Sequence, residues 1–307
     1  MRNIVKLKIA DLIIVMKSRF PIIEYSLKDW GRASRRRYNV FRYRGNRKPD
    51  IIIDVEVVDR LPVFTGGRAA FIAYGMVDRL ENWRISKRKD NYIYRSCLPG
   101  RKQLILINED FDRIRAYLPA KGKNILGWSS LDLAFDFLQI LTLNYLSHHK
   151  KGMILHAAGL KNARREGFIF SGRSGAGKST LAQLWNRYAK GGGVLNDDRV
   201  IVRRQKGKFF IYPCPWHGEF SDHELAPNTA VKLKKLFFIY HAQKNIIGKM
   251  ERRQAFDLLY PVVFSSFWKR QNQENLFFLC QELINNVPCY RLGFLKNKQV
   301  VSLLNKH

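Results

Sequence analysis

The residues best suited to chemistry in this sequence form a glycine-rich stretch near its middle. Gly172, Gly175, Gly177, Lys178 and Ser179 fill the pattern G-x-x-x-x-G-K-[ST], which is typical of a phosphate-binding loop. Glycines let successive backbone N–H groups curl around a phosphate, because no Cβ stands in the way. The lysine would reach the β- and γ-phosphate oxygens, and the serine hydroxyl would hold Mg²⁺. The pattern therefore predicts a site for ATP and Mg²⁺.

The segments on either side of this loop are those that a phosphate site needs. Phe168 to Ser171 is a short apolar run that suits a buried strand, and a helix is expected from Thr180 to Ala189. That helix would point its N-terminus at the same anion as the loop. An ordinary glycine-rich turn is the alternative, and the flanking strand and helix disfavour it. The residues expected to bind the nucleotide are Gly172, Arg173, Ser174, Gly175, Ala176, Gly177, Lys178, Ser179 and Thr180.

Two adjacent aspartates, Asp197 and Asp198, lie at the end of a second apolar segment. A carboxylate at this position holds Mg²⁺ in phosphate-loop enzymes. One aspartate can hold the metal while the other accepts the proton of an attacking hydroxyl, and a nearby histidine can tune the pair. His156 stands in an apolar segment whose pairing with Phe168–Phe170 would bring it near the phosphates. Taken alone, an aspartate pair is typical of a turn, and such a histidine is typical of a packed core.

A further candidate ligand lies in the loop from Pro213 to Phe220. Two prolines, a tryptophan and a glycine make this a stiff loop that presents its side chains. Glu219 is a candidate to complete the metal shell, and a plain surface glutamate is the alternative. The candidate metal ligands are therefore Ser179, Asp197 and Glu219.

The composition indicates a globular chain that is long enough for two modest domains. Of its 307 residues 46% are hydrophobic and 13% aromatic, which excludes a disordered chain. The four cysteines lack metal-site spacing and are expected to be reduced, packed thiols. The N-terminus lacks a signal-peptide pattern, and the apolar run Leu131–Leu146 is too short and too polar to span a bilayer. We therefore expect a cytoplasmic protein without a membrane partner.

The net charge predicts an acidic partner. Fifty-five Lys and Arg against twenty-five Asp and Glu leave +30, which would attract nucleic acid, anionic membrane or an acidic peptide. Residues 28–48 mix basic and aromatic side chains, as nucleic-acid surfaces do, and they also suit a docking site for an acidic peptide. The alternatives are a strand with a charged outer face and a genome that favours lysine and arginine on solvated faces.

The order of the expected elements divides the chain into three parts. Residues 1–125 form a mainly β region, and residues 126–150 hold a connecting helix that is apolar nearly all round and therefore buried. Residues 151–307 form the nucleotide-binding domain. Strands are expected within 3–16, 50–58, 92–96, 103–108, 153–160, 194–202, 209–212, 236–240 and 287–294, and further helices at 252–268 and 274–286.

Together, His156, the phosphate loop and the aspartate pair resemble the catalytic core of HPr serine kinase/phosphorylase and its relatives. That family shares its nucleotide-binding core with the phosphoenolpyruvate carboxykinases. The resemblance covers about 150–305, and the Pro-Trp-His-Gly-Glu loop and the Val-Pro-Cys-Tyr-Arg-Leu ending look like HPr-kinase-like proteins of peptide-modification gene clusters. It implies an α/β fold, in which a P-loop, PEP-carboxykinase-like kinase core with a mixed sheet follows a smaller, mainly β N-terminal region.

The resemblance also implies a role for each matched residue. Lys178 would contact the transferred phosphate, and Ser179 and Asp197 would hold the metal. Asp198 would be the proton acceptor, supported by His156. The signature of the Leu-Glu-Ile-Arg-Gly type that follows the aspartates in HPr kinases is absent, so Glu219 matches the family's metal-binding glutamate by position alone.

The function expected from the sequence is transfer of the γ-phosphoryl group of ATP to a Ser or Thr hydroxyl of a protein or peptide. The acceptor would be acidic and would dock on residues 28–48. Two alternatives remain open. One is a nucleotide-dependent nucleic-acid-binding module, and the other is a small-molecule kinase, which shares all the motifs. A homo-oligomer is compatible with each of them.

Overall fold

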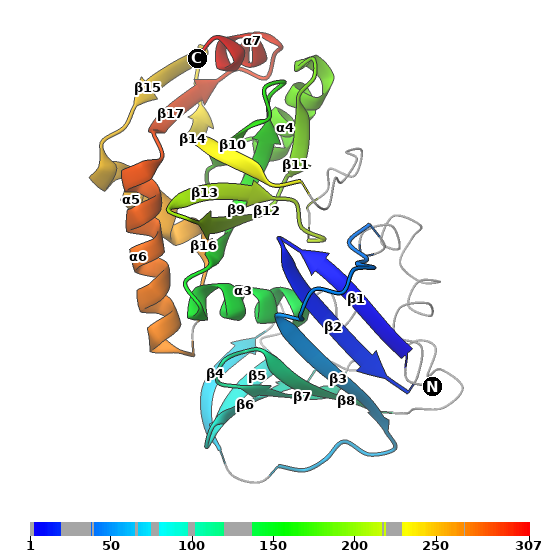
Figure 1. The fold of residues 1–307 in the computed structure, drawn as a ribbon. Helices are drawn as coiled ribbons and strands as arrows, with labels where there is room; N and C mark the ends of the chain where they lie inside the picture. The colour runs from blue at the N-terminus through cyan, green and yellow to red at the C-terminus, as the bar shows by residue number, and fades with distance from the viewer. Residues whose placement is uncertain are drawn as a thin grey trace. The chain divides into compact units, whose positions relative to one another are not determined.

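Two compact units, each built around its own β-sheet, make up the chain in the computed structural model (Figure 1). One unit comprises Met1–His148 with Ser266–Arg270, and the other His149–Ser265 with Gln271–His307. The mixed α/β character expected from the sequence is confirmed, as is the mainly β nature of the N-terminal part. The structure describes residues 3–19, 38, 40–64, 67–74, 80–97, 102–119, 137–216, 218, 229–266 and 268–307.

The first unit holds an eight-stranded mixed sheet in the order β1-β2-β3-β8-β7-β6-β5-β4. β2 and β8 run parallel to β3, and the other neighbours are antiparallel. The predicted strands in this part are confirmed, whereas β4, β5 and β8 had no clear signal in the sequence. The strands are β1 (Asn3–Ile9), β2 (Leu12–Ser18), β3 (Ile51–Val58), β4 (Arg68–Tyr74), β5 (Glu81–Arg88), β6 (Asn91–Ser96), β7 (Gln103–Asn108) and β8 (Arg113–Pro119).

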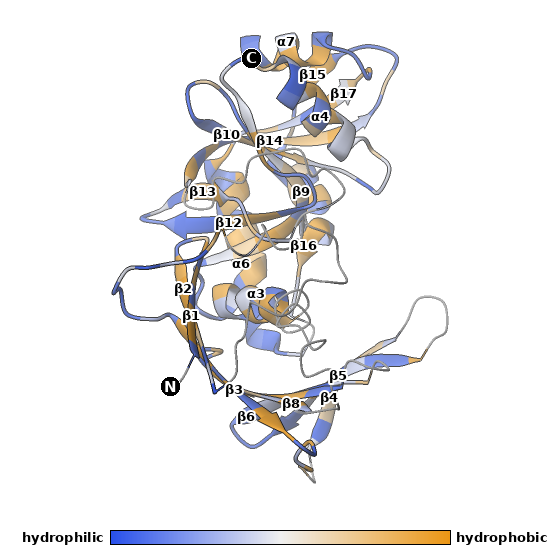
Figure 2. Cartoon of the chain, turned by 90° about the vertical axis from the view of Figure 1, so that its right-hand side faces the viewer, coloured by the Kyte–Doolittle hydropathy of each residue, from blue (hydrophilic) through white to orange (hydrophobic). Residues whose placement is uncertain are grey.

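Aromatic and aliphatic side chains form the core of the first unit. Figure 2 shows β2 in hydrophobic colours along most of its length, in keeping with its almost complete burial. Helix α3 (Leu138–His148) is buried nearly all round, as the sequence predicted, and Tyr145 donates a hydrogen bond to Asp50, 3.2 Å away. Trp268, from the short second segment of this unit, packs against Trp83 with ring centroids 6.3 Å apart. The expected start of the helix, and the predicted boundary at residue 125, lie outside the described residues.

The second unit contains the nine-stranded sheet and, among the described residues, most of the helices. Its strands are β9 (Gly152–Lys161), β10 (Glu166–Ser171), β11 (Gly193–Asn196), β12 (Arg199–Gln205), β13 (Lys208–Tyr212), β14 (Val231–His241), β15 (Ile246–Lys249), β16 (Val263–Phe264) and β17 (Cys289–Phe294). Its helices are α4 (Lys178–Tyr188), α5 (Arg252–Leu259), α6 (Arg270–Asn286) and α7 (Gln299–Lys306), with a 3₁₀ turn at Tyr260–Val262.

Five strands of the second unit form a closed ring. β10 is paired with β9 on one side and with β14 on the other. β9 continues to β12, β12 to β13, and β13 back to β14, so the pairings return to β10. β17 then extends the sheet on the far side of β14, and both β10 and β17 run parallel to β14. The predicted pairing of Phe168–Phe170 with the segment that contains His156 is confirmed, since Phe170 stands opposite Ala158.

The prediction of one helix over residues 252–268 is wrong. Helix α5 ends at Leu259, and the chain then makes the 3₁₀ turn and the short strand β16, which pairs with β9. Pro261 lies in that turn. A proline has no N–H for the helical ladder and its ring clashes with the preceding turn, which explains the early end. The consequence for the site is that Phe264, in β16, lies beside the strand that carries His156.

None of the helices among the described residues has the length and hydrophobicity needed to span a membrane.

All four cysteines are unbridged thiols, and we expect them to react slowly in the folded protein. Burial raises the pKa of Cys214, Cys280 and Cys289 to about 12, and that of Cys97 to about 11. Because the thiolate is the reactive form, little of it is present at pH 8. Titration with DTNB should modify Cys97 first, since it is the least buried, and should count four thiols only after denaturation. Rapid modification of Cys214 in the folded protein would contradict the burial described here.

Candidate functional site

The glycine-rich loop lies where β10 ends and α4 begins. β10 ends at Ser171 and α4 begins at Lys178, so the expected strand, loop and helix follow one another without a gap. The ends of the parallel neighbours β14 and β17 lie at the same edge of the sheet. In α/β sheets this carboxyl edge of the strands is where ligands bind. The elements therefore present the loop at a binding edge.

The backbone of the loop needs its glycines. Gly175 and Gly177 have φ angles of 78° and 99°, in the left-handed region that side chains with a Cβ rarely adopt. A Cβ on Gly172 would lie 2.9 Å from the carbonyl oxygen of Ile239, which is a steric clash. The loop also closes a turn, in which the Ala176 N–H donates to the carbonyl of Arg173 at 3.0 Å. The glycines thus set the backbone conformation of the loop, and glycine-rich turns of this kind bind phosphate through successive N–H groups.

The side chain of Lys178 is folded against the loop. Its Nζ donates to the carbonyl oxygens of Gly172, at 3.1 Å, and Arg173, at 3.4 Å. Burial lowers the pKa of this lysine, and the negative charge of Asp198 opposes the shift. A phosphate in the loop would offer the ammonium a charged acceptor, and charge-assisted hydrogen bonds are about twice as strong as neutral ones. The lysine is therefore placed to bind an anion held by the loop.

Two residues that the sequence analysis missed support the loop from the neighbouring strands. The Nε2 atom of His241, the last residue of β14, is 2.9 Å from the carbonyl oxygen of Gly175. The ring of Phe294, the last residue of β17, lies under Gly177, where it would be 2.8 Å from an added Cβ. Both stand at the ends of strands parallel to β10. The only signal for them in the sequence is that position in the strand.

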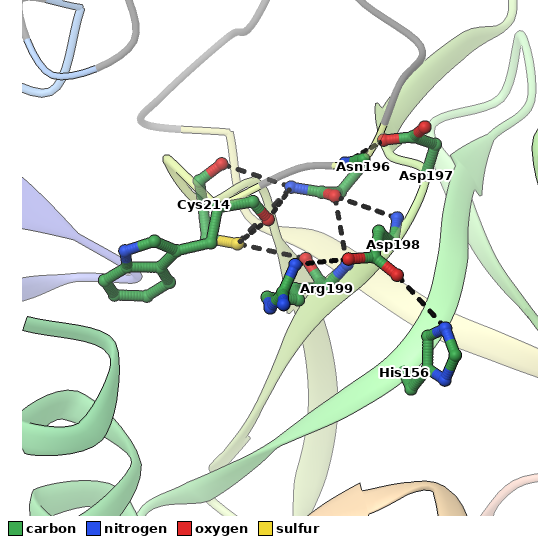
Figure 3. Close-up of polar contacts among 8 residues, drawn as sticks. His156, Asn196, Asp197, Asp198, Arg199 and Cys214 are labelled. Carbon is green, nitrogen blue, oxygen red and sulfur yellow. Dashed lines mark hydrogen bonds and ion pairs between the residues drawn. The ribbon is translucent and has the colours of Figure 1, made fainter. Parts of the chain in front are cut away.

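The turn between β11 and β12 carries the two aspartates, and Asn196 holds it in place (Figure 3). The side-chain oxygen of Asn196 accepts hydrogen bonds from the backbone N–H groups of Asp198 and Arg199, both at 3.2 Å. Its amide nitrogen donates to the carbonyl oxygen of Cys214 at 3.1 Å. Because Asn196 is fully buried, this network fixes the backbone on which both carboxylates stand.

Asp198 and His156 contact each other through their side chains at the edge of the turn (Figure 3). The His156 Nε2 atom is 3.1 Å from Oδ1 of Asp198, and the guanidinium of Arg199 is paired with the other carboxylate oxygen. The hydrogen bond from His156, together with the charges of Arg199, His156 and Lys178, lowers the pKa of Asp198 although burial opposes this. The β9–β12 pairing brings Asp198 to His156, because Arg199, the next residue after Asp198, stands opposite His156 in this ladder.

Asp197 points away from this pair. It is 1% exposed, and its Oδ1 accepts a hydrogen bond from the Gly218 N–H at 2.9 Å. A Cβ on Gly218 would lie 2.9 Å from the second oxygen, so only glycine lets the backbone come this close. Glu219, the third candidate metal ligand, lies outside the described residues. Among the residues that are described, no three or more His, Cys, Asp or Glu side chains are grouped as a metal site.

The site residues expected from the sequence thus come together in part. Asp198 lies within electrostatic reach of both Lys178 and His156, and the exposed Ser179 follows the buried Lys178 in the first turn of α4. A serine hydroxyl and a carboxylate are donors of the kind that Mg²⁺ takes together with phosphate oxygens, although the Asp197 carboxylate is buried and accepts the Gly218 N–H. The loop fits a nucleotide phosphate, since its backbone is preformed around glycines.

The basic segment at residues 28–48 is described only at position 38 and from 40 onward. These described residues help to fold the first unit. Phe41 is fully buried, and Arg47 forms ion pairs with Asp11 and Asp50. Part of its basic and aromatic character is therefore explained by folding. The rest of the segment, which the sequence analysis proposed for docking, lies outside the described residues.

Comparison with known proteins gives one family. The family profile described as SynChlorMet cassette protein ScmC matches residues 133–297, which is more than half of the 307 residues and includes every part of the site above. No curated protein matches the chain.

Proposed function

The chain belongs to the ScmC family of SynChlorMet cassette proteins, and from its site we propose that it is an ATP- and Mg²⁺-dependent kinase. The reaction would transfer the γ-phosphoryl group to a Ser or Thr hydroxyl of a peptide or protein, in the cytoplasm. The observation that carries the proposal is the Asp198–His156 pair, held beside the phosphate loop and within electrostatic reach of Lys178. A carboxylate and an imidazole in contact near a phosphate site are suited to take a proton from a hydroxyl.

Each step of the proposed phosphoryl transfer is assigned to residues of the site. The loop from Gly172 to Thr180 binds the phosphates through its backbone, and Lys178 neutralises charge on the transferred group. Ser179 and Asp197 would hold Mg²⁺, which supplies charge neutralisation at the phosphate oxygens. The Asp198–His156 pair takes the proton of the acceptor hydroxyl. Positioning and charge stabilisation would account for most of the rate, as phosphoryl transfer requires.

We also propose that the second unit is a PEP-carboxykinase-like core of the HPr-kinase type. Its support is local: a strand, phosphate loop and helix, with the aspartate pair at the end of a strand next to β9 and a histidine on β9 itself. A peptide or protein acceptor is favoured over a small molecule because the matched family is one of a peptide-modification cluster. The charge of +30 favours an acidic acceptor.

The proposal is tested by incubating the purified protein with γ-labelled ATP, Mg²⁺ and serine peptides rich in Asp and Glu. Label on the peptide serine, lost when Mg²⁺ is chelated and when the serine is replaced by alanine, would support the proposal. A neutral peptide of the same length is the control for the charge preference. Binding of ATP without transfer to any peptide, protein or water would overturn it.

Replacing Asp198 by asparagine should slow transfer by about 10²–10⁴-fold, the usual contribution of acid–base catalysis. Nucleotide binding should stay unchanged, because the carboxylate faces His156 and Arg199 rather than the loop backbone. The comparison is between the transfer rate and the dissociation constant for ATP measured by calorimetry. Transfer at the native rate would remove Asp198 from the mechanism.

The charge of +30 also favours the second candidate, a nucleic-acid-binding module. Retention on non-specific duplex DNA at a series of salt concentrations separates the two functions. A steep loss of retention with salt, without dependence on ATP and without any transfer, would favour nucleic-acid binding over the kinase.

A further inference from the structure

We propose that the Nδ1 atom of His156 accepts the proton of the acceptor hydroxyl, and that Asp198 and Arg199 are positioning residues that hold the imidazole for this step. The inference rests on the proposed kinase function and deepens it. It differs from the role that the family resemblance implies for Asp198. Its basis is the geometry of the three side chains in Figure 3.

Both carboxylate oxygens of Asp198 are already engaged. Oδ1 faces His156 Nε2 at 3.1 Å, and the guanidinium of Arg199 is paired with Oδ2. The Asp198 side chain is 25% exposed. Charge-assisted hydrogen bonds of this kind stabilise the carboxylate as an anion and occupy one lone pair on each oxygen. Both contacts stabilise the deprotonated form, so they make Asp198 a weaker proton acceptor than an unpaired carboxylate.

The imidazole of His156, by contrast, contacts a partner through only one of its two ring nitrogens among the described residues. Its Nε2 faces a carboxylate, which can only accept, so the neutral imidazole carries its proton on Nε2 and its lone pair on Nδ1. Among the residues that the structure describes, Nδ1 has no hydrogen-bond partner. The side chain is 38% exposed, more than that of Asp198, so an acceptor hydroxyl can approach it. An imidazole nitrogen is the side-chain base suited to proton transfer near neutral pH.

Arg199 is held in place from several directions. Its backbone N–H donates to Asn196, its carbonyl accepts from the Cys214 thiol at 3.0 Å, and its guanidinium lies 5.5 Å from the Phe264 ring centroid. The same phenylalanine contacts the His156 ring, with centroids 6.4 Å apart. Arg199 therefore fixes one oxygen of Asp198 and leaves the other for the histidine. In catalytic triads a buried carboxylate orients a histidine base in a comparable way.

The acceptor O–H bond breaks as its proton passes to Nδ1 of His156, and the acceptor oxygen forms a bond to the γ-phosphorus. The bond between the γ-phosphorus and the bridging oxygen breaks, and ADP leaves with that electron pair. The imidazolium, stabilised by Asp198, then releases its proton to water.

The test uses His156→Gln and His156→Ala in the full-length protein, with the serine peptide and γ-labelled ATP. Glutamine keeps an N–H for Asp198 and cannot accept a proton, so we expect transfer to fall by about 10²–10⁴-fold with unchanged ATP binding. Added imidazole should restore transfer to His156→Ala in proportion to its free-base concentration. It should not restore transfer to Asp198→Asn, in which the histidine is present and only misplaced.

Arg199 is tested by a second pair of variants. Arg199→Gln should lower the turnover number without raising the dissociation constant for ATP, and Arg199→Lys should recover part of the loss because it keeps the charge beside Asp198. Transfer by His156→Gln within about tenfold of the native rate, or equal failure of imidazole with both His156→Ala and Asp198→Asn, would overturn the inference. The proposed function fails separately, if the native protein transfers no label at all.

Discussion

Replacing Lys178 by alanine removes transfer of the γ-phosphoryl group, with an expected loss of at least about a hundredfold to a thousandfold. The Lys178 ammonium donates to two carbonyl oxygens of the loop, and Asp198 lies within electrostatic reach of its charge. In the loose transition state of phosphoryl transfer, negative charge spreads over the phosphate oxygens, and a cation held in place stabilises it without reorganisation. The rate of label transfer to the serine peptide measures the effect.

The matched control for Lys178→Ala is Lys190→Ala. Lys190 follows the far end of α4 and is exposed, so its loss removes the same charge from the protein without touching the loop. We expect a native rate for Lys190→Ala. Thermal unfolding of both variants shows whether Lys178→Ala is still folded. Equal rates in the two variants would mean that the overall charge, and not the position of Lys178, decides the activity.

A single methyl group at Gly177 should remove most nucleotide binding. Gly177 has a φ of 99°, and a Cβ there would come within 2.8 Å of the Phe294 ring. Phe294 is 2% exposed and packed in the core, so the ring cannot move aside. Strain of this kind costs about 1–3 kcal/mol. If the loop must leave its geometry to relieve that strain, affinity for ATP falls by roughly tenfold to a hundredfold. Calorimetric titration of Gly177→Ala with ATP measures this loss of affinity.

Gly207 provides the control for strain alone. It has a φ of 72°, lies in the turn between β12 and β13, and has no atom within 4 Å of an added Cβ. Gly207→Ala should lower the free energy of unfolding by about 1–2 kcal/mol and leave ATP affinity unchanged. If Gly177→Ala lost no more affinity than Gly207→Ala, the close approach of Phe294 to the loop would have no functional importance.

The parts of the fold that could be predicted are those with a local signal. The loop, its strand and its helix follow from glycine spacing and from apolar residues that are neighbours in sequence. Strands such as β3 were predicted because their side chains are mostly apolar. β5, by contrast, reads Glu-Asn-Trp-Arg-Ile-Ser-Lys-Arg, and few of its residues are buried, so no hydrophobic pattern marks it.

The parts of the site that could not be predicted depend on the sheet pairing. The contact between His156 and Asp198 requires that Arg199 stand opposite His156 in the β9–β12 ladder, and a shift of one residue would turn the side chains to the other face. The support of the loop by His241 and Phe294 requires that β14 and β17 lie beside β10. The role proposed for Arg199 rests on the same register, which a single sequence does not specify.

The closed ring of strands has a consequence for how the loop can move. β10 is paired on both sides, so a slip along one neighbour would break the ladder on the other at the same time. The backbone amides of β10 should therefore exchange with deuterium only through global unfolding, while the exposed residues at the tip of the loop exchange rapidly. Closure around a ligand would then be confined to the loop, on a base that stays rigid throughout the catalytic cycle.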